Sequence, residues 1–446
     1  MKRFARILVL GGIVAWQLTR FCGLWLASWL ATPRRGLRWR RERAQRLQAV
    51  CLVEAIRRMG ATWIKIGQIL SSRPDLLPPH LIAELETLQD QVPAEPWPDI
   101  ERVFARELGR DPDSLFAEFE KTPVAAASIA QVHRAVMPDG QQVAVKIQRP
   151  GISDRMERDL SIIALGAKVV SWIPGIHNLN LPALAAEFAR AIRKQLDFEL
   201  EASNNRRFAE NFADIDFVRV PELVPELCTR RMLVMEWIDG VRFRDAIADP
   251  PVAPQTLSTR AIEMYLGMAF RDRFVHADLH PGNLMFDAEG RFVLLDLGLV
   301  YEVPQHYVRK FVRVLTALTL FDGRAAAEAY IEGFDVPDDK RERMLADAEH
   351  LMEKYRGRSY SEIEVSEATF EIFALLRRHK IFLDAEWTGF MLAEITFEGI
   401  AKMIDKDADI LTIFTRLLPR FLALSGVVDD DDALVREAES AARAAS

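Results

Sequence analysis

The stretch HADLHPGNLMFDAEGRFVLLDLG, residues 276–298, decides the fold of this protein. Its second half reads as two short apolar strands around an Ala-Glu-Gly turn, which predicts a β-hairpin. Asp278 lies five residues before Asn283 and eighteen residues before Asp296. Carboxylate and amide oxygens are ligands that Mg²⁺ prefers, and the ion keeps several waters, so one Asp and one Asn suffice. Asp278, Asn283 and Asp296 are therefore candidate Mg²⁺ ligands.

A region upstream reads as a small antiparallel sheet. The turn Pro138–Gly140 separates two of its strands, and the last strand ends in Val143-Ala-Val-Lys146. A lysine on a strand built for burial is unfavourable unless it meets an anion such as a phosphate or a carboxylate. Lys146 is therefore a candidate phosphate-binding residue. The predicted strands are Phe116–Thr122, Ser128–Met137 and Gln141–Gln148.

These residues occur in the order that phosphoryl transfer from ATP requires. The reaction needs a lysine on the phosphates, an acid that orients the acceptor hydroxyl, and ligands for Mg²⁺. Lys146, the loop Asp278–Asn283 and Asp296 match the V-A-I-K strand, the H-R-D-x-x-x-x-N loop and the D-F-G turn of protein kinases, with Ala for Arg and Leu for Phe. Four matching residues in this order make it improbable that they are merely ordinary turn and cap residues. We therefore expect ATP or ADP and Mg²⁺ as cofactors.

The lysine needs a carboxylate partner from the helical region that follows the sheet. Helices are predicted over residues 152–172 and 183–213, and the second carries Asp197, Glu199 and Glu201. All three acids are candidates, and the residues alone do not choose among them.

The nucleotide base is predicted to lie against the strand Arg231–Trp237 and the linker after it. There the backbone carbonyl of Glu236 and the backbone N–H of Ile238 would read adenine, with Met235 lining the pocket. The predicted nucleotide-binding residues are Val124, Ala125, Ala126, Ala127, Ser128, Val132, Ala144, Lys146, Met235, Glu236 and Ile238.

Alanines stand where protein kinases have glycines in the loop that covers the phosphates. Glycine lets backbone N–H groups approach phosphates closely, whereas this protein has Ala125-Ala-Ala-Ser128. Methyl groups restrict the backbone and crowd the approach. We therefore expect an altered nucleotide pose and weak phosphorylation of ordinary substrates.

On these motifs the sequence resembles the UbiB/AarF family of atypical kinases, which is linked to ubiquinone biosynthesis. The resemblance covers roughly residues 45–300 and also rests on Lys65-Ile-Gly-Gln68 (K-x-G-Q) and on Glu201 in an E-A-x-N-x-x-x-F context. It implies an α+β, protein-kinase-like two-lobed fold with an added N-terminal helical K-x-G-Q extension and a largely helical C-terminal lobe. It implies that Lys146 contacts the phosphates, Glu201 pairs with it, and Asp278 is the catalytic acid/base. It also implies that Asn283 and Asp296 bind Mg²⁺.

The resemblance also implies regulation and a pathway. In the family the K-x-G-Q helix folds over the active site and obstructs the groove for a protein substrate, so Lys65 and Gln68 are expected to be regulatory. Asp197 ends the family's E-x-D motif and is given the same role, whereas Gln195 departs from that motif. The implied function is a membrane-associated kinase or ATPase that supports or regulates ubiquinone (quinone-lipid) biosynthesis.

A basic head precedes an acidic body. The net charge is −7, and residues 1–50 hold +10 of charge, which leaves −17 for the remainder. Because the head is also rich in Trp, Leu and Phe, an anionic membrane surface fits it better than nucleic acid. We expect a membrane lipid surface and quinone-pathway lipids or enzymes as partners and no nucleic acid. The oligomeric state is left open.

The apolar residues 7–33 admit several interpretations. A signal peptide is disfavoured because it would export an ATP-dependent enzyme. A transmembrane helix, an interfacial helix and a helix docked on its own domain remain. If helical, one face carries Lys2, Arg3, Arg6, Gln17 and Arg20. We predict attachment to the inner membrane, whether by a span or at its surface, with the catalytic domain facing the cytoplasm.

The length and the composition shifts predict five segments. They are 1–44, the membrane-associating segment; 45–112, the K-x-G-Q extension; 113–240, the N-lobe; 241–428, the C-lobe; and 429–446, an acidic, Ala-rich tail. Within the C-lobe, a helix is predicted over roughly residues 256–274. Ile410–Val428 is broken by Arg416, Pro419 and Arg420 and predicts a packed or amphipathic helix.

Two other functions compete with the leading hypothesis. The loop His276–Asn283 also resembles that of small-molecule kinases of the aminoglycoside- or choline-kinase type, although the K-x-G-Q helix and the Ala-rich loop argue against them. A nucleotide-sensing pseudokinase that acts through partners is the other, and the intact Lys146, Asp278 and Asp296 argue against it. His276 and His280 are expected to support the catalytic loop and not to bind a metal.

Overall fold

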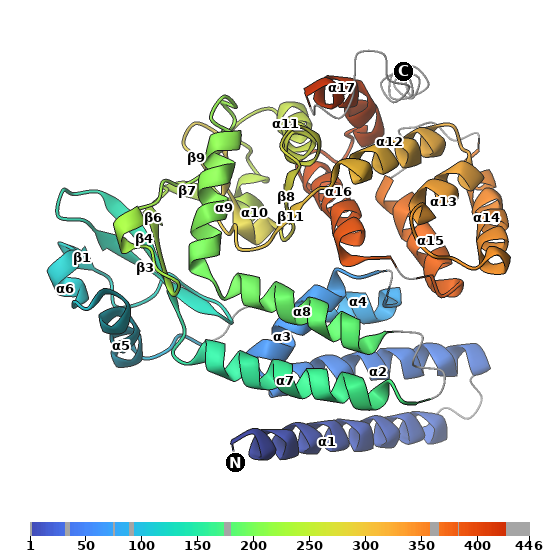
Figure 1. Cartoon of the computed structure of the whole chain (residues 1–446), viewed down its shortest axis with the longest axis horizontal. Helices are drawn as coiled ribbons and strands as arrows, with labels where there is room; N and C mark the ends of the chain where they lie inside the picture. Colours follow the sequence, from blue (N-terminus) through green and yellow to red (C-terminus); the bar gives the residue numbers. More distant parts are fainter. Residues whose placement is uncertain are drawn as a thin grey trace. The chain divides into compact units, whose positions relative to one another are not determined.

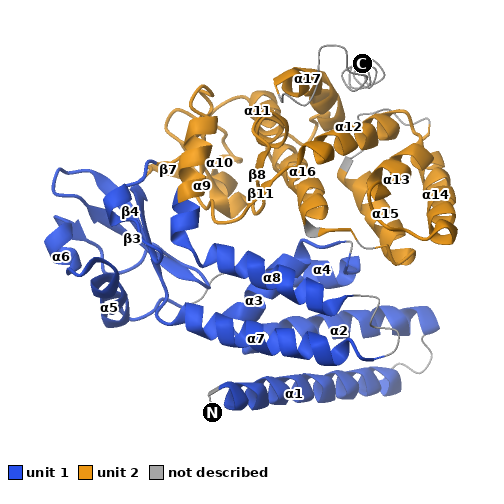
Figure 2. Cartoon of the chain, in the orientation of Figure 1, with its two compact units in different colours: residues 1–202, 222–237 blue, residues 203–221, 238–446 orange. Residues whose placement is uncertain are grey.

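The computed structural model describes residues 2–31, 36–74, 76–88, 93–173, 180–356, 365–381 and 383–424. The protein forms two compact units, which Figure 2 distinguishes by colour: unit 1 is residues 1–202 and 222–237, and unit 2 is residues 203–221 and 238–446. The architecture is α+β with a helical N-terminal extension and a helical C-terminal region, as predicted. The five predicted segments stay predictions, and the tail over 429–446 lies outside the described residues.

A five-stranded antiparallel sheet forms the centre of unit 1, in the order β1-β3-β4-β6 with β2 paired to β3. The predicted strands correspond to β1, β3 and β4; the last two are confirmed, whereas β1 is much shorter than the strand predicted over residues 116–122. The connection between the first two contributes a strand that was not predicted, because Ala125 and Ala126 pair with Val132 and Gln131. The strands are β1 (Glu118–Phe119), β2 (Ala125–Ala126), β3 (Ala130–Val136), β4 (Gln142–Gln148) and β6 (Met232–Glu236).

Alternation along β4 gives this sheet two different faces. Val143, Val145 and Ile147 are fully buried in an apolar core that includes Phe104 of α5 (Trp97–Leu108). Successive residues of a strand point to opposite faces. Burial of these three side chains therefore obliges Lys146 to project from the other face.

Helices make up the rest of unit 1, and the N-terminal helix packs along its neighbours (Figure 1). Leu10 is buried against Ala55 and Met59, with Ile162 beside them. These contacts join α1 to α2 and α7. The helices are α1 (Lys2–Ala31), α2 (Leu37–Met59), α3 (Ala61–Ser71), α4 (Pro79–Leu85), α6 (Pro112–Leu115), α7 (Ile152–Val170) and α8 (Leu181–Gln195), with a short 3₁₀ turn at Pro225–Leu227.

The prediction of a single helix over residues 183–213 is wrong. The helix is interrupted after α8, and α9 (Phe198–Asn211) starts a new helix. Asp197 Oδ1 accepts the N–H of Leu200 at 3.3 Å, as an N-terminal cap does, and Phe198 N–H donates to Arg230 O at 3.1 Å. The boundary between the two units falls inside α9, after residue 202.

Unit 2 contains two small sheets, with strand orders β5-β10-β9-β7 and β11-β8. The predicted hairpin is β9–β10, in which Phe292 lies opposite Phe286, and it is confirmed. The strands are β5 (Val218–Arg219), β7 (Gly240–Arg242), β8 (Phe274–His276), β9 (Leu284–Asp287), β10 (Phe292–Leu294) and β11 (Val300–Glu302).

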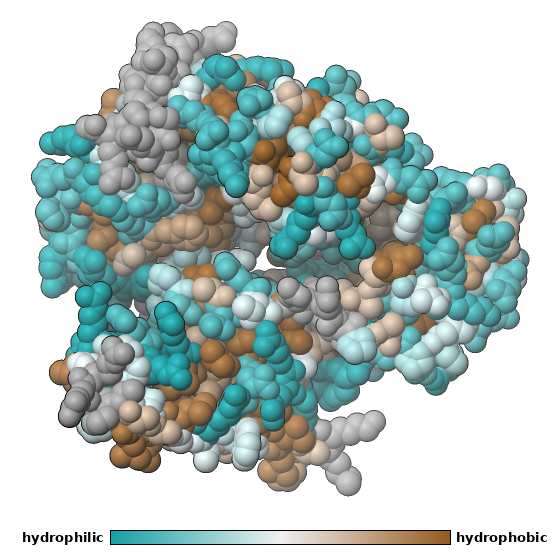
Figure 3. Space-filling view, turned by 180° about the vertical axis from the view of Figure 1, so that it is seen from behind, coloured by the Kyte–Doolittle hydropathy of each residue, from teal (hydrophilic) through white to brown (hydrophobic). Residues whose placement is uncertain are grey.

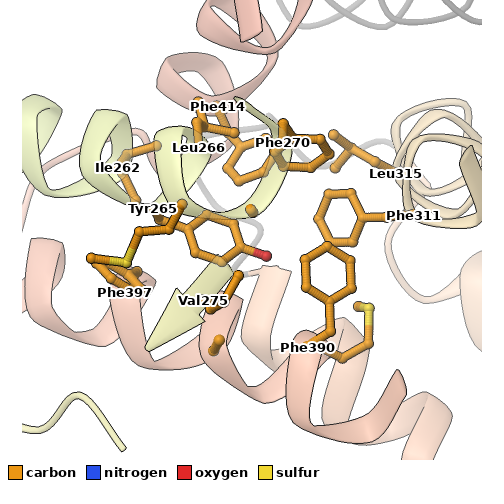
Figure 4. Packing of buried hydrophobic residues seen from close by; sticks show 14 of the residues in the cluster. Ile262, Tyr265, Leu266, Phe270, Val275, Phe311, Leu315, Phe390, Phe397 and Phe414 are labelled. Carbon is orange, nitrogen blue, oxygen red and sulfur yellow. The ribbon is translucent and has the colours of Figure 1, made fainter. Parts of the chain in front are cut away.

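An aromatic core holds the helices of unit 2 together. Figure 4 shows Tyr265 and Phe270 in contact with Phe311, Phe390 and Phe414, which come from different helices. Phe270 and Phe311 meet edge to face with centroids 5.5 Å apart, a preferred aromatic geometry. The helices are α10 (Phe243–Ala246), α11 (Pro254–Leu266), α12 (Gln305–Thr319), α13 (Gly323–Ile331), α14 (Asp338–Glu353), α15 (Val365–Arg378), α16 (Ala385–Ile404) and α17 (Ile410–Leu424).

Two helix predictions in unit 2 can be compared with the structure. The helix predicted over 256–274 is too long, because α11 passes into a π turn at Gly267–Arg271 and Arg273 then takes a φ of 50°. The packed helix predicted at residues 410–428 is confirmed as α17, which buries Phe414, Leu418 and Leu422. Residues 425–428 lie outside the described residues.

Candidate active site

The strand lysine of unit 1 forms a bidentate ion pair. Lys146 Nζ donates to Glu201 Oε1 at 2.7 Å and to Oε2 at 2.9 Å. The two side chains are only 14% and 2% exposed. Among the three acids that the sequence left open, the structure brings Glu201 to the lysine; Asp197 instead caps α9 and lies 3.5 Å from Arg230. Such a buried pair holds the ammonium at a fixed point on the sheet.

The other predicted nucleotide contacts of unit 1 share the face of Lys146. Val132 lies opposite Lys146 in the register of β3 and β4, and Ala144 lies opposite Met235 in the register of β4 and β6. Residues in register on neighbouring strands have side chains on the same face. Val132 and Ala144 are half-buried, so this part of the sheet offers a small apolar surface beside a cation.

The Ala-rich loop is an ordered hairpin. Val124 N–H donates to Val132 O and Ala127 N–H donates to Ala130 O, both at 2.8 Å. Ser128 is 1% exposed, and its Oγ has no hydrogen-bond partner among the described residues. The loop therefore keeps its shape through backbone bonds, and its alanines present methyl groups where glycines would leave space.

The predicted adenine contacts straddle a boundary. Glu236 is the last residue of β6 and Ile238 is the first residue after residue 237, where unit 1 passes into unit 2. Trp237 N–H donates to Gln142 O at 3.0 Å, which continues the sheet pairing to the end of unit 1.

The K-x-G-Q motif lies on α3 and packs against Leu88. A Cβ at Gly67 would overlap the end of the Leu88 side chain, which would then have to move. Gln68 Nε2 donates to Leu88 O at 3.0 Å. Lys65 is half-buried on the same helix. Two residues of the motif therefore fasten the segment after α4, a structural role beside the regulatory one that the resemblance implies.

In unit 2, side-chain and backbone hydrogen bonds connect the three residues of the predicted phosphoryl-transfer centre. Asn283 Nδ2 donates to Asp278 O at 2.9 Å, and Leu295 N–H donates to Asn283 O at 3.0 Å. Asp296 follows at once, and its Oδ1 accepts the N–H of Gly298 at 3.1 Å. Asp278, Asn283 and Asp296 thus belong to one hydrogen-bonded frame at the end of the β9–β10 hairpin.

Two histidines support this frame, as the sequence predicted. Nδ1 of His276 accepts the N–H of Asp278 at 3.1 Å, and Nδ1 of His280 accepts the N–H of Gly282 at 3.0 Å. Burial lowers the pKa of His276 from 6.5 to about 4, against the opposing attraction of Asp296. The ring is therefore neutral, and its Nδ1 stays available as an acceptor.

Asn204 is a site residue that the predicted set missed. It lies on α9, is 5% exposed, and its Nδ2 donates to Leu297 O at 2.8 Å, within the D-L-G turn. Phe208, one turn later, packs its ring 4.8 Å from Phe274 and 6.3 Å from His276. The E-A-x-N-x-x-x-F pattern carried this information, because Asn and Phe four residues apart share a helix face.

The donor set of unit 2 fits a hard divalent cation. Because the amide nitrogen of Asn283 is bonded to the Asp278 carbonyl, its Oδ1 points the other way. Amide and carboxylate oxygens suit Mg²⁺, which keeps several waters of its own. No cluster of three or more His, Cys, Asp or Glu side chains occurs among the described residues.

Comparison with known proteins identifies relatives across most of the sequence. The sequence model of the ABC1 atypical kinase-like domain matches residues 87–330. The Synechocystis protein slr0889 is 33% identical over 347 residues, which cover 75% of this chain and 85% of that protein. A Clostridium pasteurianum protein of the hydrogenase 1 5′ region is 32% identical over 379 residues, 81% of this chain and 69% of that one.

A solved structure shares the fold. The complex of Rv3197 with erythromycin from Mycobacterium tuberculosis superposes with a TM-score of 0.54 and covers 80% of this chain and 92% of that one. The two sequences are 24% identical, so the similarity concerns the fold alone. Together with the matched ABC1 atypical kinase-like domain, this similarity confirms the kinase-like fold expected from the sequence.

Proposed function

Because the protein belongs to the ABC1 atypical kinase-like family, we propose that it is an ATP-dependent phosphotransferase or ATPase that uses Mg²⁺ and acts at a membrane in a quinone-lipid pathway. The observation that carries the proposal is the hydrogen-bonded frame of Asp278, Asn283 and Asp296 in unit 2. This frame fixes an acid, an amide oxygen and a second carboxylate, the set that phosphoryl transfer from a nucleotide needs.

Each unit supplies its own part of the proposed chemistry. In unit 1, the ammonium of Lys146 would neutralise nucleotide phosphates, while Glu201 holds it in place from behind. In unit 2, Asp278 would orient the acceptor hydroxyl or a water and take its proton. Asn283 and Asp296 would hold Mg²⁺, which when bound neutralises charge that develops on the phosphates. Positioning and charge neutralisation supply most of the rate in this class of reaction.

A turnover assay tests the enzymatic part. ATP hydrolysis is measured for wild type, Asp296→Asn and Lys146→Ala, with and without anionic liposomes and a phenol that resembles a quinone precursor. We expect turnover to require Mg²⁺ and Asp296→Asn to lower it by about 10²-fold or more. Asp296→Asn turning over ATP as fast as wild type would overturn the assignment of the Mg²⁺ ligands.

The attachment to a membrane is proposed from the orientation of α1. Arg6 forms a bidentate pair with Asp159 of α7, at 2.8 and 2.7 Å, and Gln17 is 4% exposed. The polar face, which an interfacial helix would require, therefore contacts the protein itself through Arg6 and Gln17. The helix is long and apolar enough to cross a membrane, and only 11% of this apolar stretch is buried within the protein.

The outward face of α1 is apolar and bordered by positive charge. Leu8 and Trp16 are about 60% exposed, and Figure 3 shows hydrophobic side chains along this edge of unit 1. Arg38, Arg41 and Arg43 are exposed on the neighbouring α2. An apolar face flanked by arginines suits an anionic lipid surface, whereas the Arg6–Asp159 pair would have to break before α1 could span a bilayer.

Vesicle flotation tests this attachment. Leu8→Lys and Trp16→Lys should release the protein from vesicles of phosphatidylcholine with anionic lipid, as deletion of residues 1–33 should. Leu320→Lys changes a side chain that is 55% exposed in unit 2 and serves as the matched control. Equal vesicle binding by wild type and both α1 variants would contradict the proposal.

A further inference from the structure

One buried guanidinium holds the Ala-rich loop. Arg149 follows β4 directly and is 5% exposed. Its Nε donates to Ala127 O at 2.7 Å, its Nη2 donates to Pro93 O at 2.8 Å, and its Nη1 pairs with Glu95 at 3.0 Å. The planar arginine fork suits such a set of divergent acceptors. A single side chain thereby joins the loop to the segment that precedes α5.

The backbone of the same residue grips the other side of the turn. Arg149 N–H donates to Ile129 O at 2.8 Å, while Ala127 and Ala130 close the turn by a bond of 2.8 Å. Two carbonyls of the turn, at residues 127 and 129, are therefore bonded to Arg149. The loop cannot shift without breaking the hydrogen bond from the buried guanidinium to Ala127 O, and charge-assisted bonds of this kind are among the stronger ones in proteins.

A hydrogen-bond relay fastens the Glu95 segment to the sheet independently. Glu95 N–H donates to Gln131 Oε1 at 2.9 Å, and Gln131 Nε2 lies 2.8 Å from His133 Nε2. His133 Nδ1 lies 2.8 Å from Glu120 O, and burial lowers the pKa of His133. The neutral ring thus donates from Nδ1 and accepts at Nε2, which turns the Gln131 oxygen toward Glu95. The anchor for Arg149 is itself rigidly held.

We propose that Arg149 is a positioning residue for nucleotide binding, which fixes the Ala-rich loop in one conformation through Ala127. The inference rests on the proposed function, because it takes this loop to contact the nucleotide. Glycine-rich loops reach phosphates by being adaptable, whereas this loop is held in advance. A loop that is already ordered loses less freedom when the ligand binds, so loosening it weakens binding.

The test uses the full-length protein and a fluorescent ADP analogue with Mg²⁺. Arg149→Lys keeps the positive charge but loses the fork, and we expect its Kd for the nucleotide to rise about tenfold. Hydrogen exchange should become faster in peptides covering residues 123–131 and stay unchanged over 142–147. Arg193→Lys is the control, because Arg193 forms an exposed bidentate pair with Glu157 in the same unit, at 2.7 and 2.8 Å. It should leave Kd and loop exchange unchanged.

A merely structural arginine would give different results. Arg149→Lys would then lower the melting temperature with no change in the Kd of the folded protein, which would overturn the proposal. Combination with Ala126→Gly adds a second criterion. If Arg149 acts through the loop, the Kd of the double variant should be about that of the weaker-binding single variant. Losses of binding free energy that add fully in the double variant would refute the proposal. If Arg149→Lys does not fold, Glu95→Gln takes its place, since Arg149 is retained.

The two proposals fail in different ways. A wild-type protein that binds no nucleotide would refute the proposed function. The exchange rates over 123–131 would then still decide whether Arg149 fixes the loop, and unchanged exchange in Arg149→Lys would overturn that part as well.

Discussion

Two glutamates, one in each unit, are buried to the same extent in opposite surroundings. Glu201 and Glu394 are each 2% exposed. Glu201 receives two hydrogen bonds from Lys146. Glu394 lies near Glu398, and its Oε2 has no hydrogen-bond partner among the described residues; burial raises its pKa well above the usual value. Burial alone therefore does not make an acid part of an ionic site, because an acid buried without a cation beside it is held neutral.

Removal of the Lys146 cation, which would leave Glu201 in surroundings like those of Glu394, should have the largest effect on stability. Lys146→Met leaves Glu201 buried without its partner, and we expect the free energy of unfolding to fall by about 3–5 kcal/mol. Denaturant unfolding followed by circular dichroism measures the loss. The double variant Lys146→Met/Glu201→Leu should recover most of it, because neither charge remains. A double variant as unstable as Lys146→Met would show that the unpaired carboxylate is not the cause.

The next largest effect is expected at Asn204, whose neutral side chain is bonded to the turn beside the hydrogen-bonded frame of Asp278, Asn283 and Asp296. Asn204→Ala leaves the Leu297 carbonyl without its donor and should cost about 1–3 kcal/mol of unfolding free energy. Asn205→Ala is the matched control, since the neighbouring Asn205 donates to Pro221 O at 3.1 Å. Both variants should lose stability, but only Asn204→Ala should also lower ATP turnover. Equal turnover in the two would remove Asn204 from the site.

A pH titration of stability sharpens the comparison from the side of Glu394. Its pKa is raised in the folded state, so above about pH 4.5 the folded protein binds more protons than the unfolded polypeptide and loses stability as the pH rises. Glu394→Gln removes this titration. Its stability relative to wild type should therefore increase with pH, by at most about 1.4 kcal/mol per pH unit.

Unfolding curves at several pH values measure this slope. Glu349→Gln, at an exposed position on α14, is the control, and the difference between its free energy of unfolding and that of wild type should not change with pH. A difference between Glu394→Gln and wild type that stays constant with pH would contradict the raised pKa.

The smallest effect on stability is expected at Asp296, the carboxylate proposed to bind Mg²⁺. Asp296→Asn keeps an oxygen that can accept the Gly298 N–H, so the free energy of unfolding should change by less than about 1 kcal/mol. Thermal unfolding in the absence of nucleotide and Mg²⁺ measures it. Strong destabilisation would mean that Asp296, like Glu201, is part of the fold's charge pairing and not only of its chemistry.

Local patterns predicted much of the fold. Turn residues and alternating apolar residues located β3, β4 and the β9–β10 hairpin, because strands of this kind bury one face and are joined by short turns. The same reasoning placed Lys146 on a buried strand and Asp278, Asn283 and Asp296 around the hairpin. These assignments depend on a few neighbouring residues, which a sequence displays directly.

Contacts between distant residues could not be predicted in this way. The break before α9 depends on a bond from Phe198 to Arg230, and the choice of Glu201 over Glu199 depends on how α9 docks on the sheet. The orientation of α1 is decided by Asp159, which is far away in the sequence. A helical periodicity identifies a polar face but does not say whether water, lipid or protein covers it.

The division of α9 between the two units has a consequence for synthesis on the ribosome. The sheet of unit 1 lacks β6 until residues 232–236 have emerged, by which time residues 203–221 of unit 2 have already been made. Unit 1 therefore cannot complete its fold as a continuous N-terminal piece, although domains generally fold in the order of synthesis. No single cut of the polypeptide separates the units. Expression of unit 1 alone would require residue 202 to be joined directly to residue 222, and unit 2 alone would require residue 221 to be joined to residue 238.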